Sequence, residues 1–220
     1  MLLVNFSAIL LAYRLFGKTG LFVWIPVATI VANIQVLKTV DLFSITATLG
    51  NIVYATSFLV TDILSENYGR KEASKAVKIG FFSLVSMTVL MYIALKFNPS
   101  ADDFAQDSLK NIFGIMPRLA LASLSAYLLS QFHDIWMYNL IKKKFPAERF
   151  IWLRNNGSTM ISQLIDTAVF CFIAFTGLFT WQIFWQIFFT TYLLKWVVAV
   201  ADTPFIYIAS YWHRKEVVSD

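Results

Sequence analysis

The sequence predicts an all-α membrane protein, a polytopic helical bundle of about seven transmembrane helices. Hydrophobic residues make up 58% of its 220 residues, and aromatic residues make up 17%. Only 14% of the residues are charged, against about 25% in an ordinary soluble domain. A water-soluble globule of this length could not bury so much apolar surface. The single Cys171 also excludes a disulfide-stapled scaffold.

Seven apolar segments are the expected spans. A span needs roughly 20 mostly apolar residues, so the first segment is short and the fifth and seventh are long enough to tilt or protrude. The connecting loops are short, and we expect one transmembrane domain over residues 1–220, with an extra helix at 1–16 and a core at 20–211. The segments are Leu2–Phe16, Gly20–Leu37, Ile45–Asn67, Lys75–Phe97, Ile112–Leu140, Ser158–Leu178 and Ile183–Tyr211.

The basic residues predict the orientation of the chain. Of its 18 Lys and Arg residues, 13 fall at one side of the expected membrane, whereas Lys38, Lys96 and Lys110 fall at the other. Because cytoplasmic loops are enriched in Lys and Arg, we expect a cytoplasmic carboxyl terminus and an outside amino terminus. Membrane topology thus accounts for the net charge of +5, and we expect no nucleic-acid partner.

Ionisable residues inside the spans indicate a functional interior. Each costs at least roughly 2.5–3.5 kcal/mol at mid-depth unless it is paired or hydrated. Four acids against two bases leave a deficit of two positive charges, which a protonated carboxyl, a bound cation or a hydrogen-bond-donating substrate could fill. The bases are Arg118 and Lys195, and the acids are Asp62, Asp134, Asp166 and Asp202, with Glu66 one turn after Asp62.

Helical spacing arranges these residues in polar stripes. Asn51 and Asp62, for example, are eleven residues apart, which is about three turns and places them on one face. Several helices with one polar stripe each predict an internal substrate cavity, and structural polar pairing is the alternative. The expected substrate-binding residues are Asn51, Asp62, Glu66, Arg118, Tyr127, Asp134, Gln163, Asp166, Lys195 and Asp202.

Four motifs resemble those of the queuosine precursor transporters, which are vitamin-uptake-transporter-like membrane proteins. They cover the chain from about Gly20 to Tyr211, and the helix Leu2–Phe16 lies outside the matched part. Thr61–Lys71 resembles T-D-x-x-x-E-x-Y-G-x-K, Arg118–Asn139 resembles R-x-A-x-A-S with a Tyr and Q-x-x-D, Ser162–Thr167 resembles S-x-x-x-D-T, and Lys195 with Asp202-Thr203-Pro204 resembles the final K and D-T-P.

The resemblance implies import of a 7-deazaguanine across the cell inner (plasma) membrane, for salvage into the tRNA nucleoside queuosine. The candidate cargoes are 7-cyano-7-deazaguanine, 7-aminomethyl-7-deazaguanine and queuine. It also implies a six-helix core like that of energy-coupling-factor substrate-binding subunits. A homodimer and energy-coupling subunits both stay open as partners. The alternative is a binding subunit for another vitamin-like heterocycle, which needs a separate ATP-driven module because this chain has no P-loop.

The residue types suit such a cargo. A carboxylate can accept the ring N–H and the amino group of a guanine-like edge together, and we favour Asp166 first and Glu66 second for this role. Asn51 or Gln163 could bind the acceptor edge. A flat heterocycle also needs aromatic neighbours, and those on or near the stripes are Tyr127, Phe170, Tyr192 and Trp196.

An intramembrane enzyme or a channel fits the sequence less well. Neither His133 nor His213 has a second His or a Cys nearby, as a metal site or a nucleophile with its base would need. The polar groups carry mixed charges instead of the like-charge rings of ion channels. We therefore expect a transporter with no cofactor and no bound metal.

The sequence predicts that Asp166 and Lys195 pair with each other. They lie equally far from the turn between Thr180 and Trp181, which places both about 22 Å below it at 1.5 Å per helical residue. Breaking such a buried pair costs about 3–5 kcal/mol. In a thermal-unfolding cycle with Asp166→Asn and Lys195→Met, the double variant should lose clearly less stability than the two single variants together. Strict additivity would contradict the pairing.

Overall fold

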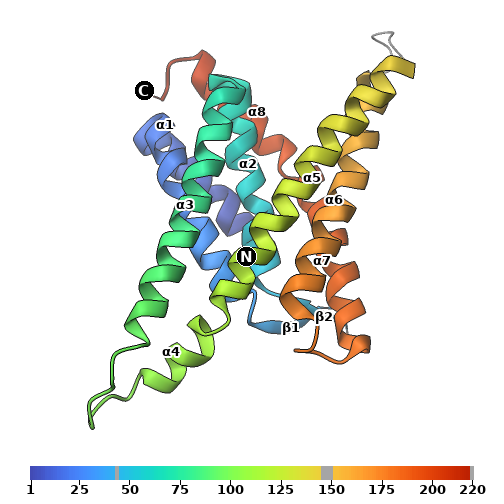
Figure 1. Cartoon of the computed structure of the whole chain (residues 1–220). Coiled ribbons are helices and arrows are strands. Elements are labelled where there is room, and N and C mark those ends of the chain that lie inside the picture. Colours follow the sequence, from blue (N-terminus) through green and yellow to red (C-terminus); the bar gives the residue numbers. More distant parts are fainter. Residues whose placement is uncertain (43–44, 145–150, 219–220) are drawn as a thin grey trace. The chain divides into compact units, whose positions relative to one another are not determined.

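The computed structural model describes residues 1–42, 45–144 and 151–218 (Figure 1). The chain forms two compact units. The first unit contains Met1–Pro117 and Leu193–Asp220, and the second contains Arg118–Tyr192. Both units are built almost wholly of helices, as the sequence predicts for a membrane protein.

Helix α1 (Leu2–Gln35) consists of two helices across a sharp bend at Gly17. Gly17 has φ 55° and ψ −142°, a conformation that glycine adopts easily and other residues rarely do. At Gly20, an added Cβ would lie 2.2 Å from the carbonyl oxygen of Ala12, so the bend brings two turns of the chain into direct backbone contact. The bend falls between the two expected segments Leu2–Phe16 and Gly20–Leu37.

A short β-hairpin replaces the start of the expected third helix. Strands β1 (Thr39–Leu42) and β2 (Ile45–Thr48) pair antiparallel, with Thr39 opposite Thr48. The expectation of a helix from Ile45 is therefore wrong, because these two stretches are rich in β-branched Thr, Val and Ile, which favour strands. Helix α2 (Gly50–Tyr68) begins after the hairpin, and its Gly50 packs directly on the backbone of α1.

Helix α2 is the central element of the first unit and packs against α1, α3 (Arg70–Ala94) and α8 (Thr203–Arg214). Fully buried side chains from α1 and α2, among them Phe6, Tyr13, Leu59 and Ile63, form the core of this unit. Between α2 and α3, Gly69 has φ 88°. The loop that follows α3 contains a short helix, α4 (Gln106–Phe113), and the carboxylate of Asp103 accepts hydrogen bonds from the amides of Ala105 and Gln106 where this helix begins.

The expected long seventh segment is two helices, and this corrects the sequence-based boundaries. Helix α7 (Trp181–Ala201) ends at Ala201, and α8 begins at Thr203 after Asp202. Pro204 has no backbone N–H, and its ring would clash in a continuous helix. The amide of Phe205 instead donates to the carbonyl oxygen of Asp202, at 2.9 Å. The break places the Asp202 side chain at the start of α8.

The second unit is built from α5 (Met116–Lys144), α6 (Ile151–Phe175) and the first part of α7. Aromatic side chains pack between α6 and α7, with ring centroids 5.0 Å apart for Phe172 and Phe184. Such clusters bury large apolar areas and prefer edge-to-face geometry. The rings of Phe184 and Trp185, 5.4 Å apart, meet in this way.

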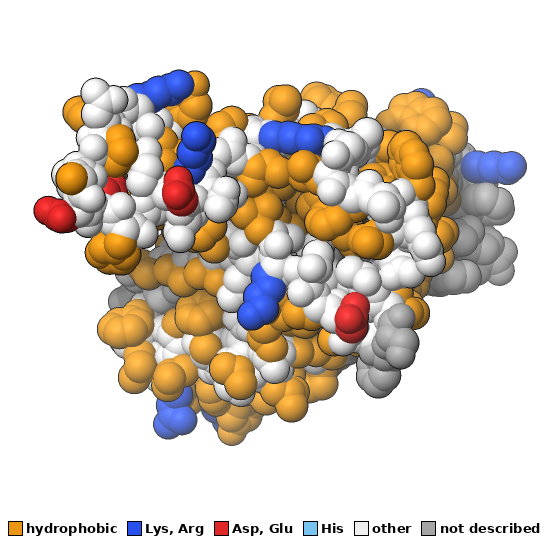
Figure 2. Space-filling model, turned by 90° about the horizontal axis from the view of Figure 1, so that it is seen from below, with side chains coloured by type: hydrophobic (Ala, Val, Ile, Leu, Met, Phe, Trp, Pro, Cys, Tyr) orange, Lys and Arg blue, Asp and Glu red, His pale blue; other side chains and the backbone are white. Residues whose placement is uncertain are grey.

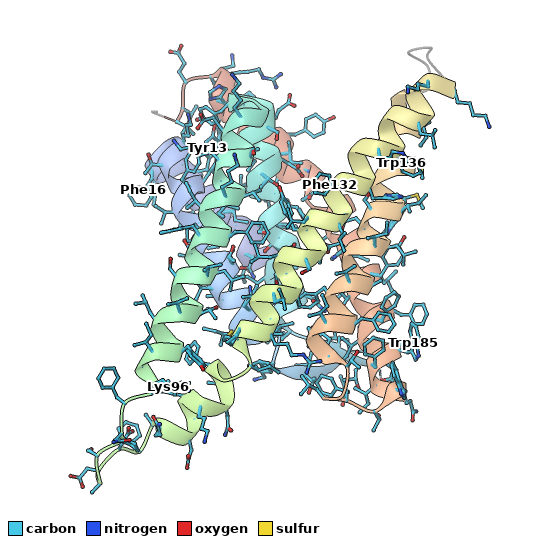
Figure 3. The ribbon with its side chains drawn as sticks, in the orientation of Figure 1. Tyr13, Phe16, Lys96, Phe132, Trp136 and Trp185 are labelled. Carbon is cyan, nitrogen blue, oxygen red and sulfur yellow. The ribbon has the colours of Figure 1, made fainter. Side chains whose placement is uncertain are left out.

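The outer surfaces suit a lipid environment. Three helical stretches in the described part are long and apolar enough to span a membrane, namely Leu2–Gln35, Lys71–Ala94 and Gln106–Ser130. Large apolar side chains such as Phe132, Trp136 and Trp185 are exposed (Figure 3). Hydrophobic side chains cover much of the face seen in Figure 2, and charged side chains are scattered across it. Together these features describe a mostly helical membrane protein.

The contact between Gly50 and α1 predicts a stability effect. In Gly50→Ala, the new Cβ would lie 2.2 Å from the Ala32 carbonyl oxygen, so α2 must move away from α1. Overpacking of this kind costs about 1–3 kcal/mol. Thermal unfolding of the purified protein in detergent should show this loss, whereas Ala94→Val, at an exposed helical position, should not. Equal stability of the two variants would contradict the close packing.

Candidate functional site

One face of α2 carries polar and aromatic residues in place of the apolar side chains of its packed faces. Asn51, Tyr54, Phe58, Asp62 and Glu66 follow one another at steps of three or four residues, which places them on one side of a helix. Asp62 and Glu66 are exposed, Tyr54 and Phe58 are half-buried, and Asn51 is buried. We refer to these five residues as the open face of α2.

Two aromatic rings and a buried cation lie at the amino-terminal half of this face. The rings of Tyr54 and Phe58 meet edge to face, with their centroids 5.6 Å apart. The Nζ atom of Lys195, on α7, lies 5.8 Å from the centroid of the Tyr54 ring, and Lys195 is only 7% exposed. A cation near an aromatic face is stabilised by the ring quadrupole. The arrangement therefore places a positive charge beside an aromatic surface.

The aromatic pair on α2 is not among the residues that the sequence pattern predicted. The expected aromatic neighbours were Tyr127, Phe170, Tyr192 and Trp196. The signal was present, because Tyr54 and Phe58 continue the spacing of four residues that joins Asp62 and Glu66. Extending the spacing of four residues from Asp62 toward the start of the helix would have identified Phe58 and Tyr54.

Asp202 lies at the start of α8, which packs against α2, the helix of Asp62. Asp202 is 3% exposed. An Asp at a helix N-cap ordinarily accepts a backbone hydrogen bond from the first turn, but the Asp202 side chain makes no such bond. Neither carboxylate has a hydrogen bond or an ion pair within the part of the chain that the structure describes.

The end of α2 fixes α1 and α8 through a hydrogen-bonded network. The Asn67 amide donates to the hydroxyl of Tyr13 at 3.0 Å, and the Ser210 hydroxyl donates to Asn67 at 3.2 Å. The hydroxyls of Tyr13, labelled in Figure 3, and Tyr68 lie 3.3 Å apart. Nearby, Lys18 forms a 3.0 Å ion pair with Glu72. The Asn-Tyr part of the motif around Asp62 therefore holds helices together.

In the second unit, Arg118 binds the end of α6. Its Nε donates to the carbonyl oxygen of Ile173 at 2.6 Å, and its Nη2 donates to that of Thr176 at 2.5 Å. The last carbonyl groups of a helix have no partner within it, and a cation there is favoured by the helix dipole. These contacts give Arg118 a structural role at this helix end.

Further polar groups of the second unit lie on α6. Asp166 is 8% exposed, and Thr167 beside it is completely buried. The Oε1 atom of Gln163 is buried and accepts no hydrogen bond within the described residues. The hydroxyl of Ser162, directly before Gln163 and one turn before Asp166, lies 3.1 Å from Nδ1 of His133. An unsatisfied buried acceptor costs free energy, and a bound donor could offset this cost.

The structure thus places the expected site residues in two groups. The first unit contains Asn51, Asp62, Glu66, Lys195 and Asp202, and the second contains Arg118, Tyr127, Gln163 and Asp166. The side chain of Asp134 lies outside the described residues. Asp166 and Lys195 belong to different units, so their pairing stays a prediction. Among the described residues, no group of three or more His, Cys, Asp or Glu side chains could hold a metal ion.

Comparison with known proteins identifies relatives along most of the chain. Residues 48–209 match the family described as "Putative vitamin uptake transporter". A Bacillus subtilis (strain 168) protein named "Probable queuosine precursor transporter" is 48% identical over 207 residues, which are 94% of this chain and 90% of that protein. The "Queuosine precursor transporter" of Escherichia coli (strain K12) is 29% identical over 146 residues, 66% of this chain and 62% of that protein. No solved structure matches the chain.

The position of Arg118 predicts a stability defect that is separate from transport. Arg118→Met keeps the length of the side chain but removes two hydrogen bonds from a charged donor, each worth about 1.5–3 kcal/mol. We expect a lower unfolding temperature in detergent. Lys96→Met, which removes a cation lying over the Tyr92 ring, is the control and should change stability little. If Arg118→Met unfolds like the wild type, the helix-capping role is wrong.

Proposed function

Since the chain belongs to the vitamin uptake transporter family and is a transporter, not an enzyme, we propose that it imports a queuosine precursor, a 7-deazaguanine base. The observation that carries this proposal is the 48% identity, over 94% of the chain, to a relative named for that cargo. The base would enter the tRNA-salvage route through the plasma membrane. The candidate bases are 7-cyano-7-deazaguanine, 7-aminomethyl-7-deazaguanine and queuine.

The open face of α2 supports a flat heterocyclic cargo. Tyr54 and Phe58 offer an aromatic edge and face within 5.6 Å of each other, and a planar base can stack on such rings. Lys195, close to Tyr54, is a donor that can bind the ring carbonyl of the base. The buried amide of Asn51 can bind the same acceptor edge.

Carboxylates can accept hydrogen bonds from the donor edge of the base. A deazaguanine presents a ring N–H and an amino group side by side, and one carboxylate can accept both. We propose Asp166 first and Glu66 second for this role. Asp166 is buried, and Glu66 lies on the exposed part of the open face. Gln163, with its unsatisfied Oε1 atom, is an additional acceptor on the helix of Asp166.

Complementation of a salvage-deficient strain tests the cargo. Cells that can neither make nor import the precursor are given this chain and one base at a time, and queuosine is measured in their tRNA. We expect queuosine with at least one of the three bases. A lack of queuosine with all three, from correctly inserted protein, would contradict the proposed cargo. Copurification of ATPase subunits with the active protein would instead favour a binding subunit of an ATP-driven transporter.

Amide substitutions separate cargo binding from structural pairing. Asp166→Asn and Glu66→Gln keep the shape of the side chain but remove acceptor capacity, and an unpaired buried partner costs roughly 1–3 kcal/mol. Each 1.4 kcal/mol is a tenfold change in affinity, so uptake per inserted molecule should fall about tenfold. Asp107→Asn, at an exposed position of α4, is the matched control. Wild-type uptake by both Asp166→Asn and Glu66→Gln would exclude these two carboxylates.

A further inference from the structure

We propose that the outward face of α3 binds an anionic phospholipid, with the headgroup at Lys71, Lys75 and Lys78 and an acyl chain along the apolar side chains that follow them. The inference goes beyond the proposed function, because it concerns the membrane-facing surface of the first unit and not its cargo. Its basis is one continuous exposed stripe on α3, which is cationic at one end and apolar beyond it.

Helical spacing aligns this stripe. Residues at alternating steps of four and three stay on one side of an α-helix, and such steps lead from Lys71 to Lys96, just after the helix ends. Every side chain on this line is exposed. On a buried face of α3, Gly80 lies so close to α1 that an added Cβ would come within 2.8 Å of Ile25. The stripe consists of Lys71, Lys75, Lys78, Phe82, Val85, Val89, Tyr92 and Lys96.

The lysines extend into the part of α3 that can span the membrane. That stretch is Lys71–Ala94, and Lys78 lies roughly 10 Å along it from Lys71, at seven residues and 1.5 Å per residue. Lysine side chains at such a depth reach toward the headgroup level and keep their methylene stems against apolar surface. The row therefore brings three ammonium groups to the level of the phospholipid phosphates.

The protein does not neutralise these charges itself. The three lysines form no ion pair with any residue that the structure describes. Glu72, the acidic residue of α3, pairs instead with Lys18 of α1 at 3.0 Å, which adds a fourth cation beside the row. The Nζ atom of Lys75 lies 5.4 Å from the centroid of the Phe22 ring, also on α1. An anion from outside the chain can therefore neutralise the row.

An anionic phospholipid matches both parts of the stripe. Its phosphate attracts the lysines, and its acyl chain can lie along Phe82, Val85 and Val89, which are 73%, 41% and 49% exposed. A free phosphate ion would leave this apolar part uncovered. At the other end of the stripe a single cation, Lys96, lies over the Tyr92 ring (Figure 3). The three lysines thus favour the leaflet on the side predicted to be cytoplasmic, where anionic lipids give a negative surface potential.

Native mass spectrometry of the detergent-purified protein tests the lipid site. We expect the wild type to retain dioleoyl phosphatidylglycerol and to lose dioleoyl phosphatidylcholine, which has the same acyl chains but no net charge. The variant Lys71→Gln/Lys75→Gln/Lys78→Gln should retain phosphatidylglycerol at least about tenfold more weakly, because each lysine near an anionic headgroup contributes to binding. The three corresponding Lys→Arg changes keep the charge and should preserve retention.

The control variant Lys38→Gln/Lys110→Gln/Lys215→Gln removes the same number of charges at exposed positions outside the stripe and should bind the lipid like the wild type. Phe82→Ser should weaken retention, and inorganic phosphate should not displace the lipid. Equal retention of the two lipids, or equal retention of phosphatidylglycerol by the wild type and the stripe variant, would overturn the site. Displacement by phosphate, or loss of a dimer in the stripe variant with unchanged lipid retention, would overturn it in favour of a soluble anion or a second copy of the chain.

Discussion

The cost of placing charge inside a membrane governs the arrangement of this protein. A buried ionisable group must be paired, hydrated or neutralised. Arg118 meets this requirement at the carbonyl end of α6, and Lys195 lies beside the Tyr54 ring. Asp62 and Asp202 have no ion pair among the described residues. A purely structural bundle does not explain why the first unit keeps these two carboxylates.

Helix interruptions create the site. Gly17 folds the first helix sharply, Gly69 turns α2 into α3, and the Asp-Thr-Pro sequence separates α7 from α8. In a membrane, freed backbone groups at such breaks must be satisfied locally. The network of Tyr13, Asn67 and Ser210 holds the surrounding helix ends. These contacts fix the helix ends at the Glu66 end of the open face of α2.

The sequence predicted the helices well because apolar length is a strong signal in membranes. It predicted the polar stripe of Asn51, Asp62 and Glu66 from spacing alone, and the structure places these residues on one face of α2. It missed the β-hairpin, since β-branched residues look equally apolar in a span, and it missed the α7–α8 break despite Pro204. The position of Asp202 at the start of α8, a helix that packs against α2, depends on that break and on helix packing, which a single sequence does not specify.

The central claim is that the open face of α2 binds the cargo. Photoaffinity labelling measures this most directly: a deazaguanine with a photoreactive group at its 7-position is irradiated with the purified protein, and the attached peptide is identified by mass spectrometry. The account predicts label within Gly50–Tyr68, on residues next to Tyr54 or Phe58, and competition by the unlabelled base. Competable label found only on peptides outside α2 would contradict it.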